Sequence, residues 1–173
     1  RTPLTGILIA EKSEGLIEST GLAPDIFSIK RFRKDLITTR LDRKNRQIHY
    51  QGNATPSSLE GGEQDRLSVV WQLLSLARTI PTKFSLGSKH KLLVVGPHDS
   101  DTWMFEIKKT QRIQTGLGEV DAIPINRLAS ENPDAQSMEI WLAPSLDWYP
   151  VKIRISEKNG DYVEQSLEKI EKK

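Results

Sequence analysis

The residues best suited to metal binding or acid–base chemistry lie together at residues 96–101 (GPHDSD). The imidazole of His98 and the carboxylates of Asp99 and Asp101 are ligand types that bind divalent metals. The same side chains could serve a hydrolase as general acid and general base. However, Asp and Ser also favour turns, because their side chains hydrogen-bond to their own backbone. We therefore favour a hairpin turn at this position and predict no metal site.

Other signatures of catalysis are missing from the sequence. The chain has no cysteine, which excludes disulfides, cysteine-ligated metals and cysteine nucleophiles. It has no Gly-x-Ser-x-Gly motif, and residues 116–118 (GLG) lack the strand-to-helix context of a phosphate loop. Residues 61–62 (GG) precede a predicted helix, but Glu63 and Asp65 at its start would repel an anion. The sequence predicts a protein that is not an enzyme and uses no cofactor.

A basic stretch runs from Lys30 to Arg46, where lysine and arginine far outnumber acids. It could be a patch for nucleic acid or for anionic lipid headgroups. It could instead be the solvated face of a two-stranded ribbon, in which lysines discourage pairing at the sheet edge. We favour the ribbon, and the formal net charge of +2 does not indicate a polyanionic partner. No nucleic-acid partner is predicted.

The elements that must position these residues are organised around a hairpin near the C-terminal end. Apolar and polar residues alternate from Tyr149 to Glu157, as is typical of a half-buried strand. A three-residue loop at residues 158–160 would place Ile155 opposite Val163, whereas a two-residue loop would place it opposite Glu164. Because the apolar faces match only in the first register, we predict a type I turn with a bulge and a positive φ at the loop glycine.

One segment, about residues 63–78, has the period of an amphipathic helix. Its apolar stripe is formed by Leu67, Val70, Trp71, Leu74 and Ala77. The acids Glu63 and Asp65 in the first turn and Arg78 in the last turn suit the helix dipole. Pro81 prevents the helix from continuing.

The remaining chain reads as short strands separated by turns. They are predicted at residues 4–11, 16–19, 25–33, 36–41, 47–50, 83–86, 91–95, 102–107, 113–115, 119–127 and 138–142. A spacing of about 8–12 residues is typical of a sandwich or barrel, and an amphipathic helix needs a sheet to bury its stripe. We predict a mainly β fold, α+β by count, in which a strongly curved antiparallel sheet or half-barrel wraps around one helix. Residues 1–173 are expected to form a single domain without a transmembrane segment.

Several short motifs follow one another along the chain. They are EGLI at residues 14–17, GLAP at 21–24, QDRLS at 64–68, TGLG at 115–118, WLAP at 141–144 and YPVKI at 149–153. In this order and spacing, from about Leu8 to Leu167, the chain resembles a bacterial cell-envelope family known as domain of unknown function 3108. The resemblance implies a location in the periplasm or cell envelope. By fold-level analogy it also implies a likeness to the half-barrels of lipoprotein-carrier proteins, which enclose an apolar cavity.

The same resemblance bears on the N-terminus. The first strands of the family are missing here, and the chain opens on Arg1 without methionine. We therefore expect a fragment that lacks an N-terminal strand or strands and any targeting segment.

Apolar residues spread over the predicted helix and sheet are the candidates for lining a cavity. They are Trp71, Leu74, Trp103, Phe105, Trp141 and Trp148. They could equally form an ordinary core, because small barrels either fill with side chains or hold a ligand.

Our leading hypothesis is a non-catalytic envelope protein that binds a lipid or another apolar or amphiphilic ligand in its half-barrel. The alternatives are a structural or assembly protein that meets an unidentified protein partner through sheet edges, and a hydrolase that uses His98, Asp99 or Asp101.

Overall fold

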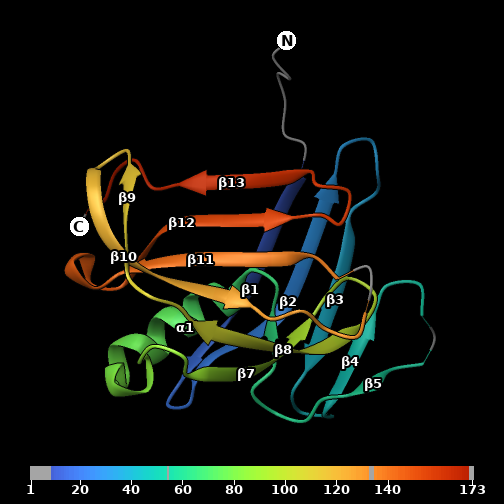
Figure 1. The fold of residues 1–173 in the computed structure, drawn as a ribbon. Helices are drawn as coiled ribbons and strands as arrows, with labels where there is room; N and C mark the ends of the chain where they lie inside the picture. The colour runs from blue at the N-terminus through green and yellow to red at the C-terminus, as the bar shows by residue number, and fades with distance from the viewer. Residues whose placement is uncertain (1–8, 54, 133–134, 172–173) are drawn as a thin grey trace. The chain divides into compact units, whose positions relative to one another are not determined.

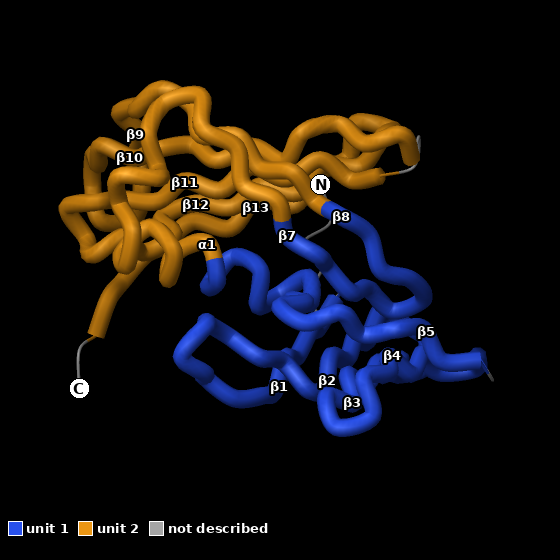
Figure 2. The backbone as a smooth tube through the Cα atoms, turned by 90° about the horizontal axis from the view of Figure 1, so that it is seen from below, with its two compact units in different colours: residues 1–72, 92–102 blue, residues 73–91, 103–173 orange. Residues whose placement is uncertain are grey.

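The computed structural model describes residues 9–53, 55–132 and 135–171, so the predicted strand segment from Leu4 to Leu8 lies outside the described residues. The chain divides into two compact units (Figure 2). Unit 1 consists of residues 1–72 and 92–102, and unit 2 of residues 73–91 and 103–173. Three elements contribute residues to both units: helix α1 (Ser68–Thr79), strand β7 (Lys89–Val95) and strand β8 (Ser100–Ile107).

Unit 1 contains an antiparallel sheet in which neighbouring strands follow one another in the sequence (Figure 1). Its strands are β1 (Ile9–Glu18), β2 (Gly21–Arg31), β3 (Ile37–Asp42), β4 (Gln47–Tyr50) and β5 (Ser57–Ser58). The short strand β6 (Gln64–Asp65) pairs in parallel with Val94 and Val95 of β7. The predicted strands at residues 36–41 and 47–50 are therefore confirmed as β3 and β4.

The first hairpin corrects the prediction of two short strands separated by a turn at residues 13–15. Strand β1 continues through Gly15, which pairs with Pro24, and Asp25 is left as the extra residue of a β-bulge in β2. A Cβ atom on Gly15 would lie 2.2 Å from the carbonyl oxygen of Ala23. Gly15 therefore permits a close approach of the β1 and β2 backbones, which is a known role of glycine within strands. The sequence prediction assigned Gly15 to a turn instead, because glycine is common in turns.

Helix α1 begins at Ser68, five residues later than predicted, because Asp65 caps it. The Oδ1 atom of Asp65 accepts hydrogen bonds from the backbone N–H groups of Leu67 (2.9 Å) and Ser68 (2.7 Å). In return the Ser68 hydroxyl accepts from the backbone N–H of Asp65 (2.9 Å). This reciprocal arrangement satisfies donors that a helix start leaves open. Asp65 is thus the cap and not, as predicted, an acid inside the first turn.

The buried side of α1 includes Val70, Leu74 and Ala77 of the predicted stripe, but it also takes in Val69 and Leu73 and leaves out Trp71. Val69, Leu73 and Ala77 are fully buried, whereas Trp71 is 44% exposed. Gln72, expected on the polar side, is only 7% exposed. A buried amide is tolerated when it has hydrogen-bond partners, and Gln72 has one in the backbone of Leu22. Among the described residues, no helix combines the length and the apolar character needed to cross a membrane.

Unit 2 contains a strongly curled, antiparallel sheet that forms a half-barrel. Its strands occur in the order β13 (Tyr162–Ser166), β12 (Tyr149–Ser156), β11 (Ser137–Ala143), β10 (Gly118–Arg127) and β8, and β9 (Gln111–Thr115) pairs with β10. One core cluster consists of Ala122, Trp141, Ala143 and Val151. The predicted mainly β architecture, with a curled half-barrel sheet and one α-helix in the described part of the chain, is confirmed.

The closing hairpin has the predicted register. Ile155 pairs with Val163 across β12 and β13. The loop is closed by a hydrogen bond from the backbone N–H of Glu157 to the carbonyl oxygen of Asp161 (2.7 Å). Gly160 has a φ of 92°, as expected of the bulge glycine in a three-residue loop.

The predicted strand at residues 83–86 is wrong. A 3₁₀ turn (Pro81–Lys83) ends at the first residue of this segment, and residues 84–86 form no strand. The backbone N–H of Phe84 donates to the carbonyl oxygen of Pro81 (3.0 Å). Proline suits the first position of a helical turn because it has no N–H group to satisfy. The Phe84 ring then stacks on the imidazole of His90, with 4.5 Å between the ring centroids.

Candidate functional site

The polar turn at residues 96–101 does not form a pocket of converging ligands. The backbone N–H of Gly96 donates to the carbonyl oxygen of Asp99 (2.7 Å), which confirms the predicted turn. His98, Asp99 and Asp101 are all exposed. The described residues contain no group of three or more His, Cys, Asp and Glu side chains that could hold a metal ion.

The basic stretch Lys30 to Arg46 covers the end of β2, the whole of β3 and the turn before β4, and so belongs to a ribbon of unit 1. Two of its arginines hold neighbouring backbone. Arg43 donates to the carbonyl oxygen of Pro24 (2.7 Å), and Arg46 donates to that of Leu59 (3.3 Å). These two side chains therefore have structural roles that do not require an anionic partner.

Five of the six cavity candidates lie in unit 2, where they make packing contacts. Leu74, Trp103, Phe105 and Trp141 are buried, and Trp148 is half-buried. The guanidinium carbon of Arg127 lies 3.9 Å from the ring centroid of Trp103. The indole N–H of Trp141 donates to the side-chain oxygen of Gln111 (3.0 Å). The sixth candidate, Trp71, lies in unit 1 and lines a groove.

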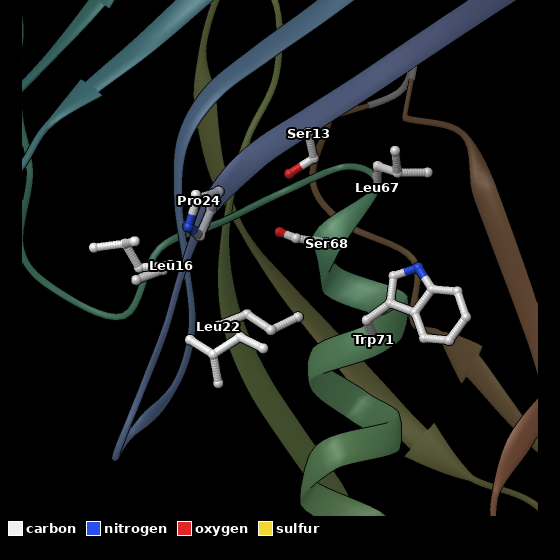
Figure 3. A pocket seen from close by; sticks show the side chains of 10 residues that line it. Ser13, Leu16, Leu22, Pro24, Leu67, Ser68 and Trp71 are labelled. Carbon is white, nitrogen blue, oxygen red and sulfur yellow. The ribbon is translucent and has the colours of Figure 1, made fainter. Parts of the chain in front are cut away.

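This groove, the β1–α1 groove, lies in unit 1 between the first hairpin and the start of α1 (Figure 3). It is lined by Ser13, Gly15, Leu16, Ile17, Leu22, Ala23, Pro24, Leu67, Ser68 and Trp71. Figure 3 shows Leu16 and Leu22 on the hairpin and Leu67, Ser68 and Trp71 on the α1 side. Its volume is about 370 Å³, within the range of about 300–1,000 Å³ that small-molecule sites occupy.

Two buried glutamines hold the hairpin against the helix and so shape the groove. The Gln72 side-chain oxygen accepts from the backbone N–H of Leu22 (2.9 Å), and the Gln64 side-chain N–H₂ donates to the Leu22 carbonyl oxygen (2.7 Å). Gly21 makes room for this contact, since a Cβ atom there would lie 2.5 Å from the Gln72 amide. Sequence reasoning missed both glutamines, because glutamine is ordinary on an exposed helix face and carries no pattern that marks it.

The polar side chains beside the groove form hydrogen bonds within the protein. Ser13 donates from its hydroxyl to the Asp65 carboxylate (2.5 Å), which is fully buried and also accepts from the backbone of Leu67 and Ser68. Further along β1, partial desolvation raises the pKa of Glu11 above its ordinary 4.5, although the residue remains exposed; Arg66 opposes this change, and Asp65 adds to it. The sequence did not identify this network, since its members lie about 50 residues apart along the chain.

The apolar side chains of the groove remain accessible. Leu16 is 63% exposed, Ile17 84% and Trp71 44%. Single apolar residues are normal on a protein surface, but exposed apolar residues that line a recess are one mark of a binding site. The arrangement can hold a hydrocarbon group, and its hydroxyl groups are already engaged with Asp65.

A second recess, of about 510 Å³, lies in unit 2 beside the β9–β10 hairpin. Charged side chains line it, and Arg112 pairs there with Glu119 (3.0 Å) and lies 3.6 Å from Asp121. Because charged side chains form part of its lining, the recess is less apolar than the β1–α1 groove, which has no charged lining residue.

Comparison with known proteins adds family membership. A family model described as "Protein of unknown function (DUF3108)" matches residues 2–168, so the chain belongs to this family. The family resemblance noted in the sequence is thereby confirmed. No curated protein and no solved structure matches the chain.

Proposed function

We propose that this member of the DUF3108 family is a non-catalytic binding protein whose β1–α1 groove holds the hydrocarbon part of an amphiphilic molecule such as a lipid. The observation that carries the proposal is the exposure of Leu16, Ile17 and Trp71 around one recess. Covering these side chains with an alkyl chain would remove their apolar surface from water, which is favourable by about 25 cal/mol per Å².

The polar groups of the groove favour this class of ligand over a sugar or a nucleotide. A polar ligand would need free donors and acceptors to replace its bonds with water. The hydroxyl groups of Ser13 and Ser68 instead interact with Asp65. A hydrocarbon chain needs no hydrogen-bond donors or acceptors, and the polar head of an amphiphile would remain in solvent.

We also propose that the protein works in the periplasm or cell envelope, where amphiphiles are abundant. The support is the resemblance to an envelope family. Fractionation of cells that carry the native gene should recover the full-length protein with periplasmic or membrane markers. Recovery with cytoplasmic markers would overturn this part of the proposal.

Calorimetric titration with dodecylphosphocholine, kept below its critical micelle concentration, tests the groove. We expect saturable binding to the unaltered chain. Trp71→Ala and Leu16→Ser should each weaken binding at least about tenfold, because the loss of about 55 Å² of apolar contact is worth about 1.4 kcal/mol. Both residues are largely exposed, so the fold should persist.

Leu86→Ser is the matched control, because Leu86 is 69% exposed and is not a groove residue. It should bind dodecylphosphocholine like the unaltered chain. Absence of binding to the unaltered chain, or equal weakening by Leu86→Ser and Trp71→Ala, would contradict the proposed function.

A further inference from the structure

Strand β1 is an unusually exposed sheet edge. In the described part of unit 1 its one strand neighbour is β2, and nearly all of its residues are exposed. The strand is long, from Ile9 to Glu18. The extra residue of the β-bulge, Asp25, lies on β2, so the side chains of β1 alternate regularly between the two faces of the sheet. Such an edge presents unpaired N–H and C=O groups that can accept a further strand.

When two copies of β1 are aligned antiparallel with Ser13 opposite Ser13, the side chains that face each other are complementary in charge and polarity. We infer that two copies of this chain pair antiparallel through β1, about a two-fold axis that passes beside Ser13 of each copy. A two-fold axis normal to the sheet keeps the face of each side chain, so paired residues must be separated by an even number of positions. Only an axis centred on a residue, and not between two residues, meets this requirement.

In the Ser13-centred register, the two-fold axis generates two pairs of opposite charge and two pairs of apolar side chains. Lys12 lies opposite Glu14 of the second copy, and Ala10 lies opposite Leu16. At the ends Ile9 lies opposite Ile17, while Glu11 meets Gly15 and therefore meets no side chain. Cross-strand pairs of opposite charge and of apolar groups both stabilise antiparallel sheets.

The neighbouring registers lack this match. An axis at Lys12 would place two lysines opposite each other, and an axis at Glu14 would place two glutamates opposite each other and Lys12 opposite Leu16. Like charges directly opposite are destabilising. Within one copy Lys12 and Glu14 already form an exposed ion pair (2.9 Å). Pairing about Ser13 would extend it into a cluster of alternating charge, which favours a second copy over an unrelated peptide.

This inference does not depend on a ligand in the β1–α1 groove, and its test uses charge reversal. Sedimentation velocity from about 10 μM to 1 mM, the range suited to a small interface, should show a reversible dimer. Lys12→Glu places two pairs of acids opposite each other, and Glu14→Lys places two pairs of bases opposite each other. Each substitution should weaken dimerisation at least about tenfold.

Two further samples distinguish pairing from a general effect of charge. The double variant Lys12→Glu/Glu14→Lys should dimerise again, and an equimolar mixture of the two single variants should form a heterodimer. Glu18→Lys, which changes the net charge as Glu14→Lys does but lies outside the nine paired residues, should dimerise normally.

The far-ultraviolet circular dichroism of every variant should match that of the unaltered chain, since Lys12 and Glu14 are exposed. A monomer at every concentration, a dimer that neither reversal weakens, or a mixture that fails to associate would overturn the inference. A monomeric chain that instead binds an extended segment of another protein at β1 would overturn it as well.

Discussion

Replacing Asp65 by alanine is expected to lower the free energy of unfolding by about 3 kcal/mol. The carboxylate is fully buried and accepts hydrogen bonds from Ser13, Leu67 and Ser68. Loss of a helix cap costs about 1 kcal/mol, and each buried donor left without an acceptor costs about 1–3 kcal/mol. Urea denaturation followed by circular dichroism measures the change.

Two milder variants show whether the network acts as described. Asp65→Asn keeps an oxygen that can cap α1, because asparagine caps helices as well as aspartate, and should cost about 1 kcal/mol. Ser13→Ala removes one hydrogen bond and should also cost about 1 kcal/mol. If Asp65→Ala cost no more than Ser13→Ala, the capping contribution argued from the Leu67 and Ser68 bonds would be wrong.

Replacing Gly15 by alanine is expected to cost about 2–3 kcal/mol. Its Cβ atom would lie 2.2 Å from the carbonyl oxygen of Ala23 and 2.5 Å from the Cα atom of Pro24. Both neighbours are backbone atoms, so relief requires β1 and β2 to separate at the bulge, and overpacking of this kind costs about 1–3 kcal/mol. The same urea denaturation applies.

Gly52→Ala separates this clash from the general cost of replacing glycine. Gly52 has a φ of 82° and no atom within 4 Å of a Cβ position. It should lose about 1 kcal/mol from its left-handed backbone conformation alone. A loss at Gly15 no larger than the loss at Gly52 would show that the two backbones are not in close contact.

Local patterns in the sequence were sufficient for several elements. The alternation before and after residues 158–160 specified the register of the last hairpin, because a slip of one residue would turn the apolar side chains to the wrong face. The turns at residues 42–45 and 96–99 followed from their own polar side chains; Asp42, for example, accepts from the backbone N–H of Asn45 (3.0 Å). The β-rich class likewise followed from the number and spacing of the short strands.

Local sequence patterns did not predict where α1 begins or which of its side chains are exposed. Glu63 and Asp65 suit a first helical turn by type, yet Asp65 caps the helix, and both side-chain oxygens of Glu63 accept from the backbone of residues 60 and 61. Trp71 suits a core by type, yet Gln72 is buried in its place because Leu22, 50 residues earlier, supplies a partner. Partners so distant in the sequence cannot be inferred from helical spacing.

Contacts between segments distant in the sequence also explain why the candidate site in the structure differs from the one that the sequence indicated. Trp71 was identified as a ligand-contacting residue from its type, but its neighbours in the groove, Leu16 and Leu22, read as parts of a short strand and a turn. By itself the sequence determined the β-rich class, the last hairpin and the family resemblance, since these depend on local alternation and motif order. Only the tertiary structure decided the groove and the free edge of β1, because both depend on which distant segments meet and which strand has no further neighbour in the described sheet.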